Sequence, residues 1–290
     1  MIYTIESDQL QVKVKSLGAE LTSIKGKTNG IEYLWQGDAA IWESQAPVLF
    51  PSVGRMKEFE YYYKGVRYDM GLHGFARHSE FAVKEEPGKL TFSLTHNDVS
   101  MKNYPFEFLL EVIFTLDGSR LNTEYRVTNT SASEVLHFGI GAHPGFNVPL
   151  VAGTEFTDYY LEFEGYNSLT HYKFVSPGLF LENETLEIPL ENSCLPLSYE
   201  VFEKTRTVML KDTDIKKVAI KSKKCPHYVS MQHESQHLAI WTAPGPYVCL
   251  EPWDGLPDYL STDGDFANKR GNHKLPPGQA KSFKHEVEFF

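Results

Sequence analysis

Apolar and polar residues alternate with a period of two in several separate segments of the chain. Residues 10–15 read Leu-Gln-Val-Lys-Val-Lys, residues 90–95 read Leu-Thr-Phe-Ser-Leu-Thr, and residues 283–289 read Phe-Lys-His-Glu-Val-Glu-Phe. Because successive side chains of a strand point to opposite faces, this pattern predicts strands with one buried face. Segments 108–116 and 121–127 flank Asp-Gly-Ser at 117–119 and predict a β-hairpin.

Helical periodicity is nearly absent from the chain. Residues 38–43 are expected to form a turn or a short helix, and residues 98–103 another. No internal repeat or low-complexity linker divides the 290 residues, and this length is ample for a substantial core. We therefore predict a single domain over residues 1–290, all-β, with antiparallel strands in two or more packed sheets.

Composition and charge narrow the classes of partner and compartment. The formal net charge of −10 argues against a nucleic-acid partner, which would require clustered Lys and Arg. No apolar run is long enough to predict a membrane span, and residues 1–8 lack the apolar region of a signal peptide. Three cysteines without a Cys-x-x-Cys spacing predict neither a disulfide framework nor a zinc finger. The expected compartment is the cytoplasm.

The first segment that could carry chemistry is residues 137–149, which read His-Phe-Gly-Ile-Gly-Ala-His-Pro-Gly-Phe-Asn-Val-Pro. Gly139 and Gly141 permit close approach of the backbone to a neighbour. Pro144 fixes the next φ and favours an extended conformation for His143, and residues 145–147 are expected to form a turn. An imidazole held in this way is a candidate proton donor. The alternative is a hydrogen-bonded structural histidine.

The second segment is residues 246–258, which read Pro-Tyr-Val-Cys-Leu-Glu-Pro-Trp-Asp-Gly-Leu-Pro-Asp. Alternation places Glu251 on one strand face with Tyr247 and Cys249, and Pro252 is expected to end that strand. A buried carboxylate without a partner has a raised pKa, which makes Glu251 a candidate general base. The alternative is a structural Glu paired with an Arg.

Two glycine-containing segments add hydrogen-bond donors. Arg55 follows Gly54, and His73 and Arg77 flank Gly74 in the segment Leu-His-Gly-Phe-Ala-Arg. The guanidinium fork suits vicinal hydroxyls or a carboxylate. The alternative for each is a surface loop with one salt bridge, and Arg77 is the weaker candidate of the two arginines.

Residues 233–237 read His-Glu-Ser-Gln-His and match the His-Glu-x-x-His pattern of zinc peptidases. That chemistry requires a helix, so that both histidines lie on one face. Strand-like segments precede and follow these residues, and Pro226 and Pro244 bracket them. We therefore predict a hairpin loop here and no zinc at His233 and His237.

The order and wording of these motifs resemble the aldose 1-epimerase (galactose mutarotase-like) superfamily. The resemblance runs from about Leu10 to the final strand and depends most on the His-Pro-Gly-Phe-Asn block and the late Glu. It implies a β-supersandwich fold and interconversion of the α and β anomers of a sugar. It also implies that His143 is the general acid, Glu251 the general base, and Arg55 and His73 donors that hold the substrate.

The segments Leu-His-Gly-Phe-Ala-Arg77 and Leu-Glu-Pro-Trp resemble the LacX-like branch, and His-Gly-Phe-Ala-Arg is also similar to the hexose-6-phosphate mutarotases. Well-characterised galactose mutarotases use an additional Asp. Asp212 and Asp214 lie in the corresponding region without a motif, so neither is assigned. Arg77 joins the candidate substrate-binding residues.

The expected partner is a small-molecule sugar, and the state is a monomer or a homodimer. A carboxylate and an imidazolium on opposite sides of the pyranose would open the ring, with no cofactor and no metal. Three alternatives stay open. One is a hexose-6-phosphate mutarotase with Arg77 and Lys57 on the phosphate. The others are a non-catalytic carbohydrate-binding protein on the same fold and a zinc hydrolase.

Overall fold

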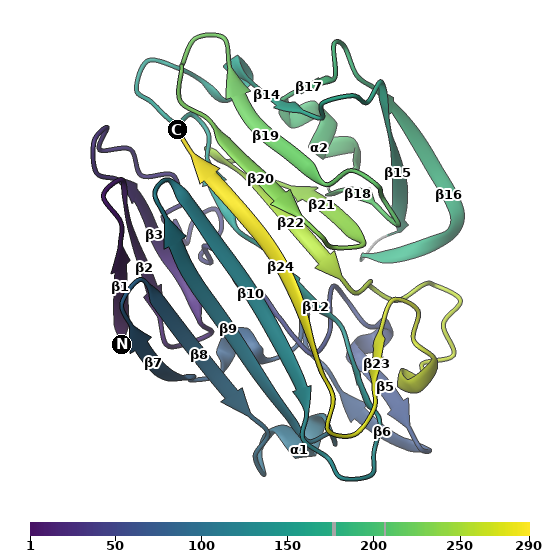
Figure 1. The fold of residues 1–290 in the computed structure, drawn as a ribbon. Coiled ribbons are helices and arrows are strands. Elements are labelled where there is room, and N and C mark those ends of the chain that lie inside the picture. Colours follow the sequence, from purple (N-terminus) through teal and green to yellow (C-terminus); the bar gives the residue numbers. More distant parts are fainter. Residues whose placement is uncertain (176–177, 206) are drawn as a thin grey trace.

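The structure is a computed structural model that describes residues 1–175, 178–205 and 207–290. Antiparallel strands in two large and several small sheets dominate it, as Figure 1 shows. The largest sheet has nine strands, in the order β17 (Cys194–Pro196), β14 (Tyr159–Glu162), β19 (Lys217–Ser222), β20 (Val229–His233), β24 (Ala280–Phe289), β10 (Arg120–Asn129), β9 (Phe108–Asp117), β8 (Lys89–Thr95) and β7 (Ala82–Glu86). The predicted all-β, antiparallel fold is confirmed.

A second, six-stranded sheet carries the predicted chemistry. Its order is β18 (Thr207–Leu210), β21 (His237–Trp241), β22 (Tyr247–Asp254), β12 (Ile140–Ala142) and β4 (Val48–Leu49), and β13 (Gly145–Asn147) also pairs with β22. The smaller sheets are β1 (Ile2–Glu6) to β2 (Leu10–Lys15) to β3 (Glu20–Gly26), β5 (Glu60–Tyr63) with β6 (Val66–Asp69), β11 (Leu136–Phe138) with β23 (His273–Leu275), and β15 (Ser168–Val175) with β16 (Leu179–Pro189).

Helical structure in the described residues is short. It consists of α1 (Ser100–Asn103), α2 (Tyr199–Thr205) and the 3-10 turns η1 (Lys57–Phe59), η2 (Ala76–His78), η3 (Phe156–Asp158) and η4 (Phe266–Asn268). The short helix predicted near 98–103 is confirmed as α1, and α2 was not predicted. Within the described ranges no helix combines the length and the apolar character that crossing a bilayer would require.

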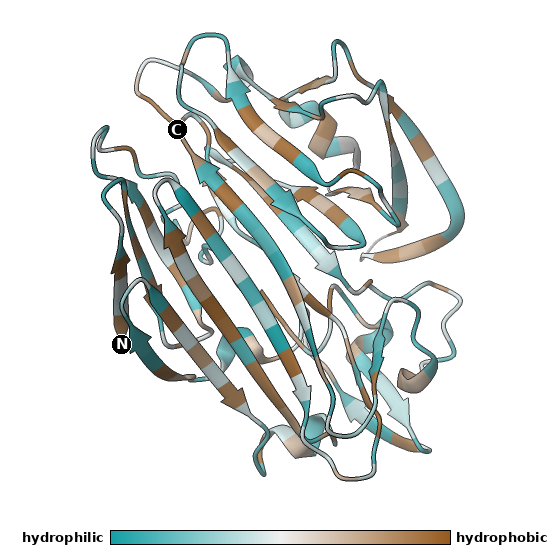
Figure 2. Cartoon of the chain, in the orientation of Figure 1, coloured by the Kyte–Doolittle hydropathy of each residue, from teal (hydrophilic) through white to brown (hydrophobic). Residues whose placement is uncertain are grey.

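The period-two segments form the strands that their pattern predicts. Residues 10–15, 90–95 and 283–289 lie in β2, β8 and β24, and the hairpin around residues 117–119 joins β9 to β10. Figure 2 shows hydrophobic and hydrophilic residues alternating along these long strands. The apolar faces meet in one large core cluster, which includes Phe114 and Val287 of the nine-stranded sheet and Val248 and Leu250 of the six-stranded sheet. The two sheets are therefore packed against each other.

Strand β22 is buried along its whole length and has two different faces. Val248 and Leu250 point into the core between the sheets. Because side chains alternate, Cys249 and Glu251 point to the other face of the six-stranded sheet. Tyr247 and Cys249 lie there in a separate small apolar cluster. The face of β22 that carries Glu251 is thus distinct from the face that packs in the core between the two large sheets.

Three local predictions were wrong. Pro252 does not end its strand. On one side of β22, the pairing with β12 ends at Gly141↔Trp253 and the pairing with β13 begins at Gly145↔Cys249, so Pro252 lies in the gap between the two ladders. No ladder bond from that side is therefore needed at Pro252. Residues 145–147 form strand β13 rather than a turn. Residues 234–236 are not a hairpin loop, since β20 belongs to the nine-stranded sheet and β21 to the six-stranded sheet.

Candidate active site

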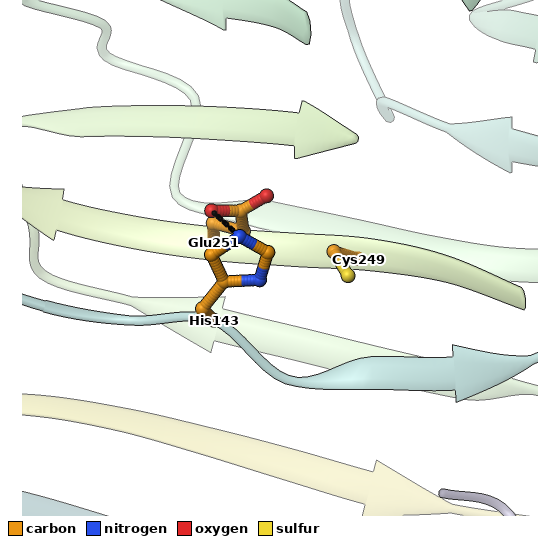
Figure 3. A group of neighbouring side chains, drawn as sticks. All are labelled: His143, Cys249 and Glu251. Carbon is orange, nitrogen blue, oxygen red and sulfur yellow. Dashed lines mark ion pairs between the residues drawn. The ribbon is translucent and has the colours of Figure 1, made fainter. Parts of the chain in front are cut away.

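His143 and Glu251 are cross-strand neighbours. The pairs Gly141↔Trp253 and Gly145↔Cys249 flank them, and the same register places His143 opposite Glu251. The imidazole Nε2 lies 3.2 Å from the carboxylate Oε2, and Figure 3 shows the two side chains meeting. From the sequence these two groups are expected on opposite sides of a sugar ring. That expectation was wrong, because a 3.2 Å contact leaves no space for a ring between them.

The carboxylate of Glu251 is almost fully enclosed, with 1% of the residue exposed. As predicted, it shares its strand face with Tyr247 and Cys249. Within the described residues its ion partner is His143, and neither carboxylate oxygen has a hydrogen bond that meets normal geometry. The alternative of a structural Glu paired with an Arg finds no support in the part of the chain that is described.

Burial shifts the pKa values of this pair in opposite directions. It raises the pKa of Glu251 well above the ordinary value of 4.5, and the nearby indole of Trp253 opposes this shift. Burial also lowers the pKa of His143 well below 6.5, and the neighbouring His73 and Arg77 act in the same direction. Both shifts penalise charge, so in the resting site the proton of the pair lies on the Glu251 carboxyl and the His143 imidazole is neutral.

His73 lies beside this pair in a tight turn. Its φ is +62° and that of Gly74 is +75°, and a Cβ on Gly74 would come within 2.2 Å of the Phe50 carbonyl oxygen. The amide of Gly54 donates to Nδ1 of His73 at 3.1 Å. Burial and Arg77 lower the pKa of His73 to about 3. The ring is therefore neutral near pH 7, and Nε2 carries its proton as a fixed donor.

The two arginines are held by different contacts. The guanidinium of Arg55 lies 4.0 Å from the centroid of the Phe59 ring. The guanidinium of Arg77 donates through Nη2 to Oγ of Ser44 at 2.7 Å. The ammonium of Lys57 donates instead to the carbonyl of Leu260. Lys57 is not part of the lining around His143, so its expected pairing with Arg77 on a phosphate was wrong.

One cavity of about 610 Å³ brings all five predicted residues together. Its volume is in the range of ordinary small-molecule sites. It is lined by Trp42, Gly54, Arg55, Leu72, His73, Arg77, His143, Phe174, Val175, Gly178, Glu203, Thr207, Trp241, Glu251, Trp253 and Pro257. Another hollow, of about 640 Å³, lies over the charged outer face of β10, β20 and β24 and contains none of the five. The chemistry therefore points to the first cavity.

Sequence reasoning missed the aromatic walls of this cavity. Three of the four tryptophans of the chain line it, namely Trp42, Trp241 and Trp253. The Trp42 ring lies 5.1 Å from the His143 ring and 5.3 Å from the Trp241 ring, measured between centroids. Phe146, the aromatic residue nearest in sequence to His143, is buried in the core instead. The signal available in the sequence was that the chain has only four tryptophans, a residue type whose large ring suits the wall of a sugar site.

Several other residues lie away from the cavity. Asp212 and Asp214 are exposed and do not line it, so neither is placed to act as the family's additional Asp. His237 accepts the amide of Asp212 through Nδ1 at 2.9 Å, whereas His233 lies opposite His285 in the nine-stranded sheet. The segment between them is not helical, as predicted, so the arrangement of a zinc peptidase does not form.

Among the described residues, one group has the residue types and spacing of metal ligands. It consists of His143, Cys249 and Glu251, whose ligand atoms lie within 4.8 Å of one another. All three residues are buried. Cys249 was noted in the sequence only for its position on the strand face.

Known proteins resemble this chain over nearly its whole length. The family model described as aldose 1-epimerase matches residues 1–288. The plasmid-encoded protein LacX of Lactococcus lactis subsp. lactis is 35% identical over 288 residues, covering 96% of this chain and 95% of that protein. The chromosomal LacX of the same organism shows the same identity and coverage.

Solved structures show the same fold. A galactose mutarotase related enzyme from Lactobacillus acidophilus superposes with a TM-score of 0.95 at 32% identity, covering 100% of this chain and 97% of that one. A galactose mutarotase-like protein from Lactobacillus casei ATCC 334 has a TM-score of 0.91 at 33% identity, with both chains fully covered. With the family match over nearly the whole length, these similarities lead to one conclusion: the chain belongs to the aldose 1-epimerase family.

Proposed function

We propose that Glu251 and His143 form the general base and general acid of the sugar mutarotation that membership of the aldose 1-epimerase family assigns to this chain. The observation that carries the proposal is the 3.2 Å contact between His143 Nε2 and Glu251 Oε2 on the wall of a sugar-sized cavity. A sugar in this cavity meets a proton acceptor and a proton donor side by side.

The side-by-side arrangement suits the chemistry of a hemiacetal, because O1 and the ring oxygen O5 are bonded to the same carbon, C1. The proton of the pair first passes from the Glu251 carboxyl to Nε2 of His143 across their 3.2 Å contact. Glu251 then takes the proton of the O1 hydroxyl while His143 gives its proton to O5. The C1–O5 bond breaks and C1 becomes the aldehyde carbon. Rotation about C1–C2 and the reverse transfers close the ring as the other anomer. General acid–base catalysis contributes roughly 10²–10⁴-fold to such a step.

The other lining residues would hold the sugar. Nε2–H of His73 is a fixed donor, and Arg55 and Arg77 offer donor forks to hydroxyl groups. The faces of Trp42 and Trp241 would contact the C–H groups of a pyranose. Donors and rings of this kind orient a neutral sugar without any cofactor.

A phosphorylated sugar is a second candidate substrate. The observation in its favour is that two arginines, Arg55 and Arg77, line the same cavity. Guanidinium groups bind phosphate through paired hydrogen bonds. Anomer exchange of glucose and galactose should be compared with that of their 6-phosphates at equal concentrations. A preference of tenfold or more for the phosphates would assign the phosphosugar, and the opposite preference the free sugar.

The test of the catalytic pair uses Glu251→Gln, His143→Asn and the double variant. Exchange between anomers is measured by NMR exchange spectroscopy and corrected for the uncatalysed rate. Each single variant should lose roughly 10²–10⁴-fold in kcat. The double variant should be little worse than the worse single one, since both groups serve one event.

The exposed carboxylate of Glu107 lies outside the cavity, so Glu107→Gln serves as the matched control and should exchange anomers at the normal rate. Sugar binding by each variant is measured separately by calorimetry. If Glu251→Gln retained exchange near the wild-type rate, the assignment of the base would fail. If the wild type bound sugar without catalysing exchange, the protein would be a carbohydrate-binding protein on this fold.

A further inference from the structure

The catalytic pair has a third neighbour, the thiol of Cys249. Cys249 and Glu251 are two residues apart on β22, so their side chains point to the same face, and His143 joins them from the adjacent chain segment. The sulfur, one imidazole nitrogen and a carboxylate oxygen lie within 4.8 Å of one another. Figure 3 draws Cys249 and Glu251 on the same strand, with His143 on the neighbouring segment. None of the proposed proton transfers uses the thiol.

These three groups have the chemistry of a zinc site. Zinc takes Cys sulfur at about 2.3 Å, His nitrogen at about 2.0–2.1 Å and carboxylate oxygen at about 2.0–2.2 Å, usually in a tetrahedron. Side-chain rotations would have to bring the three ligand atoms, which lie within 4.8 Å of one another, to these distances from one point. His143 Nε2 and Glu251 Oε2 are already 3.2 Å apart, which is close to the edge of such a tetrahedron.

A second observation points to a ligand at this place. Glu251 is 1% exposed, yet among the described residues neither carboxylate oxygen makes a hydrogen bond of normal geometry, and its polar neighbours are His143 Nε2 at 3.2 Å and the indole of Trp253. Nδ1 of His143 is also buried without one. A buried carboxylate in this condition gains most from an occupant that accepts its lone pairs, and a cation does so more strongly than a neutral hydroxyl group.

We propose that His143, Cys249 and Glu251 reversibly bind a zinc ion at the wall of the cavity, and that this ion blocks mutarotation. His143 and Glu251 line the cavity, so a water or a sugar hydroxyl from the cavity would supply the fourth ligand. Zinc on Nε2 and on the carboxylate removes the acid and the base at once, so the bound metal is an inhibitor. The blocking effect depends on the proposed function, whereas the binding does not.

Cobalt provides a direct test of the binding. Co²⁺ is titrated into the metal-free protein, and absorption is followed for the charge-transfer band of a cobalt–thiolate bond. The wild type should saturate at one ion per chain, and Zn²⁺ should displace the cobalt. Cys249→Ser should lose the band, whereas Cys194→Ser and Cys225→Ser, which change the other two free thiols, should retain it. A band that survives in Cys249→Ser, or that is absent from the wild type, overturns the site.

Zinc inhibition of anomer exchange tests the consequence. Zn²⁺ should inhibit the wild type in competition with sugar, and EDTA should restore the rate. Cys249→Ser should need at least tenfold more zinc for the same inhibition. If Cys249→Ser does not fold, Cys249→Ala replaces it. In addition, the cobalt band of the wild type must fade as sugar is added, because sugar and metal would compete for the same place. Cobalt binding without inhibition would overturn the blocking role. A wild type that exchanges no anomers even without metal would instead refute the proposed function, and the cobalt band would still decide on the site.

Discussion

Lys269 and Asp258 form a buried ion pair, with Nζ 2.6 Å from Oδ1 and both side chains 5% exposed. The second oxygen of Asp258 accepts the amide of Lys57 at 3.0 Å, and the Asp258 amide donates to the carbonyl of Arg55 at 2.8 Å. The pair thus lies directly behind an arginine that lines the cavity. We therefore expect this pair to hold the backbone that presents Arg55.

Replacing Lys269 with Met should therefore affect both stability and sugar use. Breaking a buried pair leaves the Asp258 charge uncompensated, which costs about 3–5 kcal/mol of unfolding free energy. KM should rise as Arg55 loses its fixed position, with a smaller change in kcat. Urea denaturation and exchange kinetics provide the two measurements.

The matched control is Lys64→Met, which breaks a pair of similar length, 2.7 Å to Glu134, between exposed side chains. Its cost should be much smaller than that of Lys269→Met, because solvent screens the attraction between exposed charges. Equal costs for the two variants would show that the Lys269–Asp258 pair contributes no more than a surface contact.

The pH dependence of kcat/KM should report the shared proton of His143 and Glu251. With the pKa of Glu251 raised and that of His143 lowered by burial, the pair holds one proton between these two values. Below the interval both groups are protonated and the base is lost. Above it both are deprotonated and the acid is lost. We expect a flat maximum whose acid limb lies below pH 6.5.

The profile is measured from pH 4 to 10 after subtraction of the buffer-catalysed rate. His143→Asn should remove the acid limb and Glu251→Gln the alkaline limb from whatever activity remains. An acid limb centred at or above pH 6.5 would contradict the lowered pKa of His143.

Trp42 should contribute to sugar binding through its ring face. Its ring contacts the rings of His143 and Tyr247, with centroid distances of 5.1 Å and 5.3 Å, and also lines the cavity. Taking the value of an aromatic pair, about 0.5–1.5 kcal/mol, for the contact between sugar and ring, we expect Trp42→Leu to raise KM by roughly 2–10-fold. Trp42→Phe retains a ring and should lose less. Quenching of tryptophan fluorescence by sugar, present in the wild type and reduced in Trp42→Leu, would support the same placement. An unchanged KM in Trp42→Leu would remove the ring from the binding site.

The protein should lose stability steeply as the pH falls below about 6.5. Burial lowers the pKa to about 3 or 4 for six histidines, which are His73, His171, His233, His237, His273 and His285. These rings stay neutral in the folded state, whereas the unfolded chain takes up protons near pH 6.5. Each histidine can therefore cost up to about 1.4 kcal/mol per pH unit between 6.5 and its folded pKa.

Urea denaturation at pH 7.5, 6.5, 5.5 and 4.5 checks this slope. His285→Gln provides a direct comparison, because it removes one ring that must remain neutral in the core. Its unfolding free energy should depend less on pH than that of the wild type. A stability that is flat from pH 7.5 to 4.5 would contradict the lowered pKa values.

The sequence by itself determined the fold class and most of the long strands. Alternation in segments 10–15, 90–95 and 283–289 is a local property, because a strand with one buried face requires it whatever its neighbours are. It also determined that residues 233–237 are not helical. The five candidate residues were recognisable through the motif order, and all five line one cavity.

Only the tertiary structure decided how these residues meet. The 3.2 Å contact of His143 with Glu251 depends on the register of β12 and β13 against β22, which pairs segments about a hundred residues apart. Pro252 remains within strand β22 because the gap between β12 and β13 lies opposite it, so no strand on that side requires a hydrogen bond from Pro252. The walls of Trp42 and Trp241 come from a turn and from another strand of the sheet. Local propensity carries no information on pairing between distant strands, since pairing is decided by which apolar faces can be buried together.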